Sequence, residues 1–485
     1  MKYQPIQNFI NGKFVNASTN KTLDVISPLD GNHLSTVPMS SAKDLDDAVQ
    51  AAKKAFPSWS KTPIKERVQV FFRYKTLLEK HLKELSELCS EENGKTYGES
   101  VAEIEKCIEL TEFATSLPQL TTGEVLEVSR GVECRTEHVA LGVVASIVPF
   151  NFPSMVPNWT LPNAIALGNC MIMKPSEKVP LSCGKIAELL KEAGLPDGVF
   201  NVVHGDVEIV NAICDHPNIE AVSFVGSTKV AKLVYQRATN NLKRCLSLGG
   251  AKNHLMVLPD AIPGMTAQNV AASMSGCAGQ RCMAASAMVG VGNIDHIVEK
   301  ICDEARKIVP GKNLGAVINK ESQQKIEAYI TQAEKDGAKI LVDGRNTKVE
   351  GKENGTYVGP TVIDFVTPQM SVATEEIFGP VISIMRTNTV DEALAIENAN
   401  PYGNAASVFT QNGAMARYII DRASAGMIGV NVGVPVPREP FSFGGWNESK
   451  FGVGDITGKS SIEFWTKLKK STTKWNPEAG VNWMS

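Results

Sequence analysis

The sequence has no apolar run that approaches the ~20 residues needed for a membrane-spanning helix. Its first residues, Met1-Lys2-Tyr3-Gln4-Pro5, lack the charged stretch and apolar core of a secretion signal. The net charge is only −3 at pH 7, and charges of both signs are interspersed, so no bulk field would attract nucleic acid or an anionic membrane. We therefore expect neither of these as a partner.

Cysteine is also scarce, with ten residues in a chain of 485, far below the density of a disulfide-stapled fold. Cys277 and Cys282 are separated by four intervening residues, but no second Cys or His pair at zinc-finger spacing accompanies them. The sequence therefore predicts no metal site and a cytoplasmic protein whose thiols stay reduced. With 43% hydrophobic residues, a chain of this length suffices for a large core and for two or three domains.

Hydrophobic periodicity divides the chain into a helical part and two alternating parts. Apolar residues at three-to-four spacing predict helices over 42–112. Between 140 and 250, short apolar runs typical of buried strands alternate with helical stretches, which indicates a parallel, doubly wound α/β sheet. The expected strands are 143–148, 170–174, 199–203 and 221–225, and the expected helices are 182–193, 208–214 and 228–238. A second alternation, with apolar runs at 254–258, 286–291, 381–385 and 406–409, predicts a second α/β layer.

One cysteine has a setting that favours reactivity. In Gly279-Gln280-Arg281-Cys282-Met283 a permanent cation adjoins Cys282, and a positive neighbour lowers a thiol pKa from its usual ~8.5. Gly279 would let the backbone come close to whatever the sulfur attacks. The alternative is a packed core thiol, since free cysteines are usually buried and inert.

A rigid turn follows the first expected strand. In Pro149-Phe150-Asn151-Phe152-Pro153, two prolines enclose one amide side chain at the carboxyl end of a strand. An amide held there could donate a hydrogen bond to a developing oxyanion. The alternative is an ordinary Asn turn.

Two motifs lie where open α/β sheets hold ligands, at the carboxyl ends of strands. Lys174-Pro175-Ser176-Glu177 closes the second strand, and Gly226-Ser227-Thr228 joins the fourth strand to a helix. Ser227 or Thr228 is the expected N-cap, and exposed N–H groups at a helix start bind phosphate. A solvated turn and a plain helix cap are the alternatives.

A third motif, Glu375-Glu376-Ile377-Phe378-Gly379-Pro380, is an acidic pair that runs into an aromatic residue and a Gly-Pro break. A carboxylate there could accept hydrogen bonds from ribose hydroxyls. A solvated loop is the alternative.

The order and joint presence of these motifs resemble the NAD(P)-dependent aldehyde dehydrogenase superfamily over nearly the full chain. Within it, the sequence is similar to the CoA-acylating methylmalonate-semialdehyde dehydrogenases. The motifs that carry this second resemblance are Ile213-Cys214-Asp215-His216-Pro217, Gly250-Ala251-Lys252-Asn253-His254, Gly279-Gln280-Arg281-Cys282-Met283-Ala284, and an end region from Phe464-Trp465-Thr466 to Lys474-Trp475.

The resemblance implies an aldehyde dehydrogenase-like α/β fold of two doubly wound domains and a small β arm. The NAD-binding domain would comprise 1–119 and 140–250, and the catalytic domain 251–465. The arm, 120–139 and 466–485, would assemble the chain into a homodimer or homotetramer.

The resemblance also assigns roles to the motifs. Cys282 would be the nucleophile, and the Asn151 side chain with the Cys282 main-chain N–H would form the oxyanion hole. Lys174 and Glu177 would bind the adenosine ribose, Ser227 beside Gly226 the pyrophosphate, and Glu376 the nicotinamide ribose. Phe378 would pack near the nicotinamide, and Phe150 would be a further cofactor-binding residue. Because Glu177 would repel a 2′-phosphate, we expect NAD rather than NADP.

Two positions depart from the superfamily. Hydrolytic members carry a Glu in an E-L-G-G motif that activates the deacylating water, and matching Leu248-Gly249-Gly250 puts Ser247 at that position. A serine hydroxyl cannot act as a general base at neutral pH. The branch also commonly has an Arg where this chain has Lys106, so Arg281, Lys106 and Arg438 are the candidates for holding an anionic substrate.

These features predict NAD-dependent oxidation of a short anionic aldehyde, such as malonate or methylmalonate semialdehyde. The acyl group would form a thioester on Cys282 and pass to CoA as co-substrate. The alternative is a non-acylating dehydrogenase of another short anionic aldehyde, such as sulfolactaldehyde, that releases the free acid. A binding protein that kept the fold and lost catalysis is disfavoured because the nucleophile, oxyanion donor and cofactor residues occur together.

Overall fold

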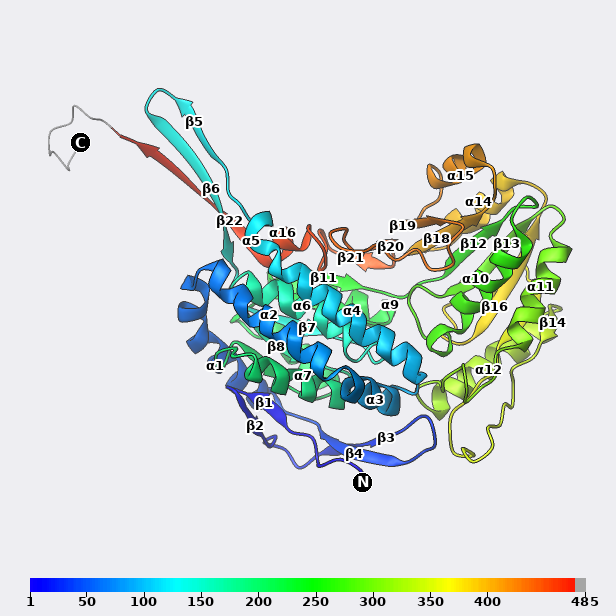
Figure 1. The fold of residues 1–485 in the computed structure, drawn as a ribbon, viewed down its shortest axis with the longest axis horizontal. Coiled ribbons are helices and arrows are strands. Elements are labelled where there is room, and N and C mark those ends of the chain that lie inside the picture. The colour runs from blue at the N-terminus through cyan, green and yellow to red at the C-terminus, as the bar shows by residue number, and fades with distance from the viewer. Residues whose placement is uncertain (476–485) are drawn as a thin grey trace.

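The computed structural model describes residues 1–475, and Figure 1 shows two α/β layers side by side with a β arm projecting from the first. The helical region predicted over 42–112 is present as four helices. They are α1 Ala42–Lys61, α2 Ile64–Lys80, α3 Leu82–Asn93 and α4 Tyr97–Thr115. α1 and α4 begin at capping boxes, in which Ser41 and Thr96 exchange hydrogen bonds with the residues three positions on.

The first sheet has the strand order β2-β1-β9-β8-β7-β10-β11-β21. Its central strands are parallel, and β7 and β8 are buried along their whole length, as the uninterrupted apolar runs predicted. The strands are β1 Asn8–Ile10, β2 Lys13–Val15, β7 Val143–Ile147, β8 Cys170–Lys174, β9 Phe200–Val202, β10 Ile219–Val225, β11 Arg244–Leu248 and β21 Lys450–Phe451.

The chain order of this sheet reverses between β7 and β10. From β7 the chain passes through β8 to β9 on one side, then returns to β10 and β11 on the other. Because parallel crossovers are right-handed, the helices before and after the reversal cover opposite faces. They are α6 Met155–Ala166 and α7 Leu181–Glu192 on one face, and α8 Val207–Asp215 and α9 Thr228–Asn240 on the other. Ligands bind at such a switch point in doubly wound sheets.

The second sheet has the order β14-β15-β16-β13-β12-β18-β19 and is parallel except for β14. Its strands are β12 Asn253–Val257, β13 Ala285–Val291, β14 Lys339–Val342, β15 Thr361–Asp364, β16 Val381–Thr387, β18 Ala405–Phe409 and β19 Met427–Val430. Its helices are α10 Pro263–Ser275, the 3-10 turn η1 Gly276–Gly279, α11 Asp295–Arg306, α12 Lys320–Lys335, α13 Ser371–Thr374, α14 Val390–Ala399 and α15 Gly413–Ile420. The predicted second α/β layer is thus confirmed.

The arm is a three-stranded antiparallel sheet with the order β22-β6-β5. Its strands are β5 Val125–Ser129, β6 Val132–Ala140 and β22 Thr466–Lys474. The short helices α5 Leu117–Leu120 and α16 Ser461–Trp465 lead into it, and the last part of the predicted 466–485 segment lies outside the described residues. The segments 120–139 and 466–475, far apart in the chain, therefore lie side by side (Figure 1).

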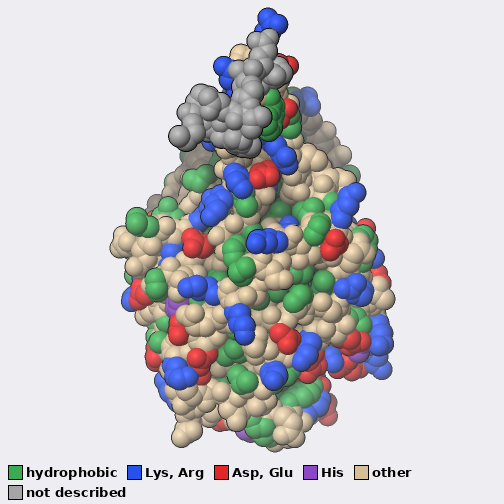
Figure 2. All heavy atoms as spheres, turned by 90° about the vertical axis from the view of Figure 1, so that its left-hand side faces the viewer, with side chains coloured by type: hydrophobic (Ala, Val, Ile, Leu, Met, Phe, Trp, Pro, Cys, Tyr) green, Lys and Arg blue, Asp and Glu red, His purple; other side chains and the backbone are tan. Residues whose placement is uncertain are grey.

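Two small antiparallel pairs complete the architecture. They are β3 Thr22–Ile26 with β4 His33–Pro38, and β17 Tyr402–Gly403 with β20 Trp446–Asn447. Viewed from the side of the arm, the surface carries Lys and Arg interspersed with Asp and Glu (Figure 2). Across residues 1–475, none of the helices combines the length and hydropathy that crossing a bilayer would require.

Candidate active site

A cleft of about 610 Å³ brings together nine of the twelve site residues predicted from the sequence. They are Phe150, Asn151, Lys174, Glu177, Gly226, Ser227, Cys282, Glu376 and Phe378. The first sheet supplies the loops after its strands: Phe150 and Asn151 follow β7, and Gly226 follows β10, on the two sides of the switch point.

The second sheet contributes residues from the amino ends of its strands to the same cleft. Cys282 comes shortly before β13 and Glu376 shortly before β16, so both project from the amino ends of these strands. The cleft is therefore formed by the carboxyl edge of one sheet and the amino edge of the other, which strand-end reasoning on the sequence did not predict.

The Cys282 thiol does not have the low pKa predicted from its neighbour Arg281. Burial raises the pKa of Cys282 to about 12, and the nearby Glu376 carboxylate adds to the rise. The main-chain N–H of Cys282, Arg281 and the N–H of Met283 pull in the other direction without prevailing. Arg281 does act to lower the pKa of Cys282, as predicted, but desolvation of the thiolate outweighs it, so the net shift is upward.

Two asparagine side chains hold the main chain of Cys282. Asn253 Nδ2 donates to the carbonyls of Cys282 at 2.7 Å and Ala284 at 3.0 Å. Asn404 Nδ2 donates to the same Cys282 carbonyl at 2.9 Å. Sequence reasoning missed both roles; Asn253 belongs to a motif quoted for the family resemblance, but Asn404 carries no local signal.

The side chain of Asn151 is buried and held in one orientation. Its Nδ2 donates to the carbonyl oxygen of Gln280 at 3.0 Å. A carboxamide nitrogen has two hydrogens, so the second is free to serve an oxyanion in the cleft. Gln280 is itself anchored, because its Oε1 accepts from the N–H of Ile318 at 3.0 Å.

At the far end of the cleft, Lys174 Nζ lies 3.2 Å from Glu177 Oε2. Burial lowers the pKa of Lys174, and Glu177 opposes this shift. Asp206 lines the same end of the cleft, and the positive charge of Lys174 contributes to lowering the pKa of Asp206, after the N–H of Glu208 and Lys21. The sequence analysis did not single out Asp206.

The turn between β10 and α9 leaves room only for glycine. A Cβ on Gly226 would fall 2.5 Å from the ring of Phe224. Ser227 is the N-cap of α9, yet its hydroxyl makes no capping hydrogen bond within residues 1–475. Ser227 lines the cleft, so this hydroxyl is available to bind a ligand there. Thr228 instead accepts from the N–H of Gly250 at 2.8 Å.

The Glu376 carboxylate is half-buried and lies beside Gly250. Its Oε1 accepts from the N–H of Ala251 at 3.1 Å. Burial raises the pKa of Glu376 to about 7, against the pull of Ala251, Lys252 and Lys325. Lys252 Nζ is buried without a hydrogen-bond partner in the described part of the chain, and burial lowers its pKa to about 7.

Phe150 and Phe378 meet across the cleft. Their ring centroids are 5.8 Å apart at an interplanar angle of 85°, an edge-to-face contact. Phe378 has φ +59°, a left-handed conformation that is uncommon for an aromatic residue. The loop of the Glu375-to-Pro380 motif is thus held against the loop that carries Asn151.

The three cations predicted to hold the substrate are not among the described residues that line this cleft. Arg281 Nε donates to Cys277 Sγ at 3.4 Å, and its guanidinium lies 3.7 Å from Glu99. Lys106 Nζ pairs with Glu439 at 2.6 Å, and Arg438 is exposed. Glu439, the residue that follows Arg438 in the chain, is therefore paired with Lys106.

Ser247 lies in β11 and is fully buried. Its Oγ is 3.6 Å from Cys245 Sγ, and Ser247 is not among the described residues that line the cleft. The lining residues that carry a carboxylate are Glu177, Asp206 and Glu376. Residues 1–475 contain no group of three or more His, Cys, Asp or Glu side chains arranged to hold a metal ion.

A thiol and an amide donor, in a cleft between two α/β sheets that also carries three carboxylates, are groups that an aldehyde-oxidising enzyme needs. The sequence profile of the aldehyde dehydrogenase family matches residues 14–471, and the chain belongs to this family. The resemblance predicted from the motifs is confirmed.

Individual relatives and solved structures that the chain resembles are also aldehyde dehydrogenases. The chain is 43% identical to malonate-semialdehyde dehydrogenase 2 of Geobacillus kaustophilus, over 97% of this chain and 99% of the relative. It is 41% identical to the mouse mitochondrial methylmalonate-semialdehyde/malonate-semialdehyde dehydrogenase [acylating], over 98% and 90%. The crystal structure of methylmalonate-semialdehyde dehydrogenase from Oceanimonas doudoroffii matches with a TM-score of 0.96 at 43% identity, over 98% and 99%. A putative methylmalonate-semialdehyde dehydrogenase from Sinorhizobium meliloti, complexed with NAD, matches with a TM-score of 0.97 at 40% identity, over 99% of each chain.

Proposed function

We propose that this aldehyde dehydrogenase oxidises a short anionic aldehyde, malonate or methylmalonate semialdehyde, with NAD, and passes the acyl group from Cys282 to CoA. The observation that carries the proposal is the placement of Cys282 and Asn151 in one cleft with the half-buried Glu376 carboxylate. The names of the relatives at 41–43% identity support the substrate class.

In the first half-reaction the thiolate of Cys282 adds to the aldehyde carbon, and the carbonyl electron pair moves to the oxygen. The free N–H of Asn151 and the main-chain N–H of Cys282 stabilise that oxyanion. When bound, NAD accepts the hydride that leaves this carbon. The acyl group then remains on Sγ as a thioester, and the Gln280 contact keeps the Asn151 amide in place.

The cleft fits NAD. Gly226 and the uncommitted Ser227 hydroxyl at the start of α9 would receive the pyrophosphate. Lys174 and Glu177 would bind the adenosine ribose, and Glu376 the nicotinamide ribose, beside Phe150 and Phe378. Two carboxylates, Glu177 and Asp206, stand at the end where a 2′-phosphate would lie, which supports NAD rather than NADP.

Acyl transfer to a thiol is supported by the absence of a suitable base. Ser247 is bonded to Cys245 in the sheet, and Glu376 is committed to the N–H of Ala251. Glu177 and Asp206 belong to the Lys174 end of the cleft. Among the described residues that line the cleft, Glu376 is thus the carboxylate near Cys282, and one of its oxygens is already taken by Ala251. This supports CoA as the group that attacks the thioester, with Cys282 as the leaving group.

The cation that holds the anionic end of the aldehyde stays a prediction. Arg281 is held by Cys277 and Glu99, and the charge of Lys106 is already paired with Glu439. Of the three candidates, Arg281 adjoins the nucleophile in the chain, and its side chain is about a quarter exposed. We propose Arg281 as the principal cation, with Lys106 and Arg438 as secondary ones.

Product analysis tests the proposal. The enzyme is incubated with malonate semialdehyde and NAD, with and without CoA, and NADH and acyl products are quantified. We expect CoA to accelerate turnover and to appear as acyl-CoA. Cys282→Ala should abolish NADH formation, whereas Cys302→Ala, in the remote helix α11, should retain it. Free acid as the sole product, formed at a rate indifferent to CoA, would favour the non-acylating alternative and call for a test of sulfolactaldehyde.

We also propose that 1–119 with 140–250 binds NAD, that 251–465 carries the nucleophile, and that the arm assembles homodimers or homotetramers in the cytoplasm. Ten free cysteines support the reducing compartment. Apolar side chains are exposed on β5 (Val125, Leu126 and Val128, at 61%, 65% and 53%), as expected for a surface covered by another copy.

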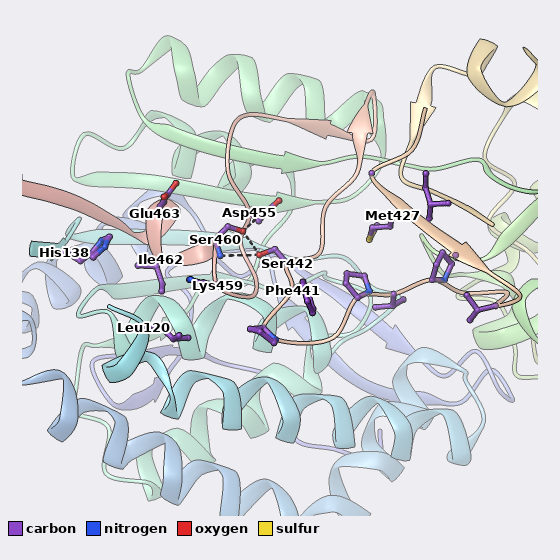
Figure 3. Close-up of a pocket in the computed structure, with 18 residues that line it drawn as sticks. Leu120, His138, Met427, Phe441, Ser442, Asp455, Lys459, Ser460, Ile462 and Glu463 are labelled. Atoms are coloured by element: carbon purple, nitrogen blue, oxygen red, sulfur yellow. Dashed lines mark hydrogen bonds between the residues drawn. The ribbon is translucent and has the colours of Figure 1, made fainter. Parts of the chain in front are cut away.

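A cavity of about 970 Å³ extends from the base of the arm to the edge of the second sheet, and His138 on β6, Ile462 on α16 and Met427 on β19 line it (Figure 3). Light scattering on the full chain tests the assembly. Leu126→Asp should shift an oligomer towards smaller species, while Val309→Asp, on an exposed position after α11 in the second α/β layer, should not. A monomeric wild-type chain at working concentrations would refute the proposal.

A further inference from the structure

We propose that Lys95 is a positioning residue for the oxyanion donor Asn151, acting through the main-chain carbonyl of Asn151. The inference rests on the role of Asn151 in the proposed function. Lys95 lies in the short connection between α3 and α4, far from the Asn151 loop in the sequence, and nothing in its local motif predicts this role.

The contacts of Lys95 are direct. Its Nζ donates to the carbonyl oxygen of Asn151 at 2.8 Å and to Glu103 Oε2 at 2.5 Å. It also lies 4.2 Å from the ring centroid of Phe152, a cation–π contact with the residue after Asn151. The side chains of Lys95 and Glu103 are both fully buried, at 0% exposure.

Glu103 extends the clamp to the other end of the same loop. Its second oxygen, Oε1, accepts from the main-chain N–H groups of Ser154 at 2.8 Å and Met155 at 2.9 Å, at the start of α6. One buried ion pair thus holds the loop between β7 and α6 by a carbonyl at one end and by two N–H groups at the other. Asn93 adds a third tether, since its Nδ2 donates to the carbonyl of Phe150 at 2.8 Å.

A role in positioning Asn151 explains why the Lys95–Glu103 ion pair is buried despite its desolvation cost. Burying a Lys–Glu pair rarely gains stability over apolar packing, so its presence under a loop that carries an oxyanion donor calls for another reason. A donor must lie within a few tenths of an ångström of its place, and a misplacement of ~1 Å can cost about 100-fold in rate. Lys95 thus fixes the main chain of Asn151, and Gln280 separately orients its side-chain amide.

The groups around Lys95 keep it charged. Although burial opposes ionisation, Cys277, Glu103 and Cys89 hold the pKa of Lys95 above its ordinary value. The ammonium therefore donates to the Asn151 carbonyl across the whole working pH range. A neutral side chain of similar length at this position would leave both that carbonyl and Glu103 without their partner.

A double-mutant cycle tests the inference on the full-length enzyme with malonate semialdehyde, NAD and CoA. Asn151→Ala should lower kcat by about 100- to 1,000-fold, as for loss of an oxyanion donor. Lys95→Met should lower kcat by roughly 10- to 100-fold while the KM for aldehyde and the Kd for NAD change less than about 3-fold. In the Asn151→Ala background, Lys95→Met should lower kcat by less than about 3-fold, because there is no donor left to position.

The matched control is Lys243→Met. Lys243 is also buried and donates to a main-chain carbonyl, that of Ile219 at 2.8 Å, but it lies before β11 at the opposite edge of the first sheet. We expect a comparable loss of thermal stability and a kcat within about 2-fold of wild type. Glu103→Gln, which keeps the volume and weakens the clamp, should lower kcat in the same direction as Lys95→Met even if the latter does not fold.

The outcomes distinguish a failure of the oxyanion role of Asn151 from a failure of the positioning role of Lys95. If Asn151→Ala leaves kcat unchanged, the oxyanion role in the proposed function fails. If Asn151→Ala is strongly impaired but the Lys95 or Glu103 effect is fully multiplicative in that background, the positioning inference is overturned. A fall in kcat for Lys243→Met equal to that for Lys95→Met would also overturn it, because general destabilisation would then explain the loss.

Discussion

Arg281 Nε lies 3.4 Å from Sγ of Cys277, five residues before the nucleophile, and not against Cys282 itself. The neighbour in the sequence is therefore not the neighbour in space. Cys277 and Ala278 have φ +51° and +53°, so the chain turns sharply before Cys282 and directs the Arg281 side chain back towards α4 and Glu99. The reactivity of Cys282 is set instead by its burial and by Glu376.

Alkylation of Cys282 in the free enzyme should be slow at neutral pH. With the pKa of the thiol raised to about 12, the rate with iodoacetamide should rise about tenfold for each pH unit between 7 and 9, with no plateau. Mass spectrometry of the Cys282 peptide measures this rate. Arg281→Gln should slow alkylation further, since the cation stabilises the thiolate; a plateau below pH 8 would contradict the burial argument.

Binding of NAD should depend on pH through Glu376. Burial raises the pKa of this carboxyl to about 7, so the group is largely protonated at pH 6 and ionised at pH 8. Ribose hydroxyls donate to the ionised form, so the Kd for NAD should fall by up to about tenfold over this range. Calorimetric titrations of wild type and Glu376→Gln check this: the variant should bind more weakly with a flat profile, and an equal slope in both would refute the assignment.

Cofactor choice should follow the carboxylates near Lys174. Glu177→Gln should raise kcat/KM for NADP relative to NAD by about tenfold, because a repulsive charge near the 2′-phosphate is removed. Asp206→Asn should act in the same direction and keep its capping of α8, since Asn is as good an N-cap as Asp. Glu208→Gln, on the same helix but outside the cleft, is the control and should leave the ratio unchanged.

Gly279 should not tolerate a side chain. It has φ +72°, and a Cβ would fall 2.0 Å from the carbonyl oxygen of Gly379. The tight approach is to the loop that carries Glu376, not to the substrate as the sequence suggested. Gly279→Ala should therefore lower the free energy of unfolding by several kcal/mol or more, at least ~1 of it from φ alone.

Chemical denaturation followed by circular dichroism measures the loss. Gly184→Ala is the matched control, because Gly184 lies inside α7 with open space around its Cβ position. That substitution should be neutral or stabilising by up to ~1 kcal/mol. Equal stability of the two variants would show that the Gly279 approach is not enforced.

The sequence alone determined the alternation of strands and helices and the placement of its motifs at strand ends. The runs at 143–148 and 170–174 became β7 and β8 because an uninterrupted apolar segment is stable only where both faces are covered. Motifs that follow such strands, at Asn151, Lys174 and Gly226, were bound to meet at one edge of the sheet.

Only the tertiary structure decided which distant groups complete the site and how they are charged. Cys282 and Glu376 enter from the amino edge of the second sheet, and the buried ion pair of Lys95 and Glu103 holds the loop that carries Asn151. Burial and long-range electrostatics, which no local pattern encodes, raise the pKa values of Cys282 and Glu376. Only the tertiary structure also decided the partners of Arg281 and Lys106. A side chain binds the group that folding brings within reach, here Cys277 for Arg281 and Glu439 for Lys106.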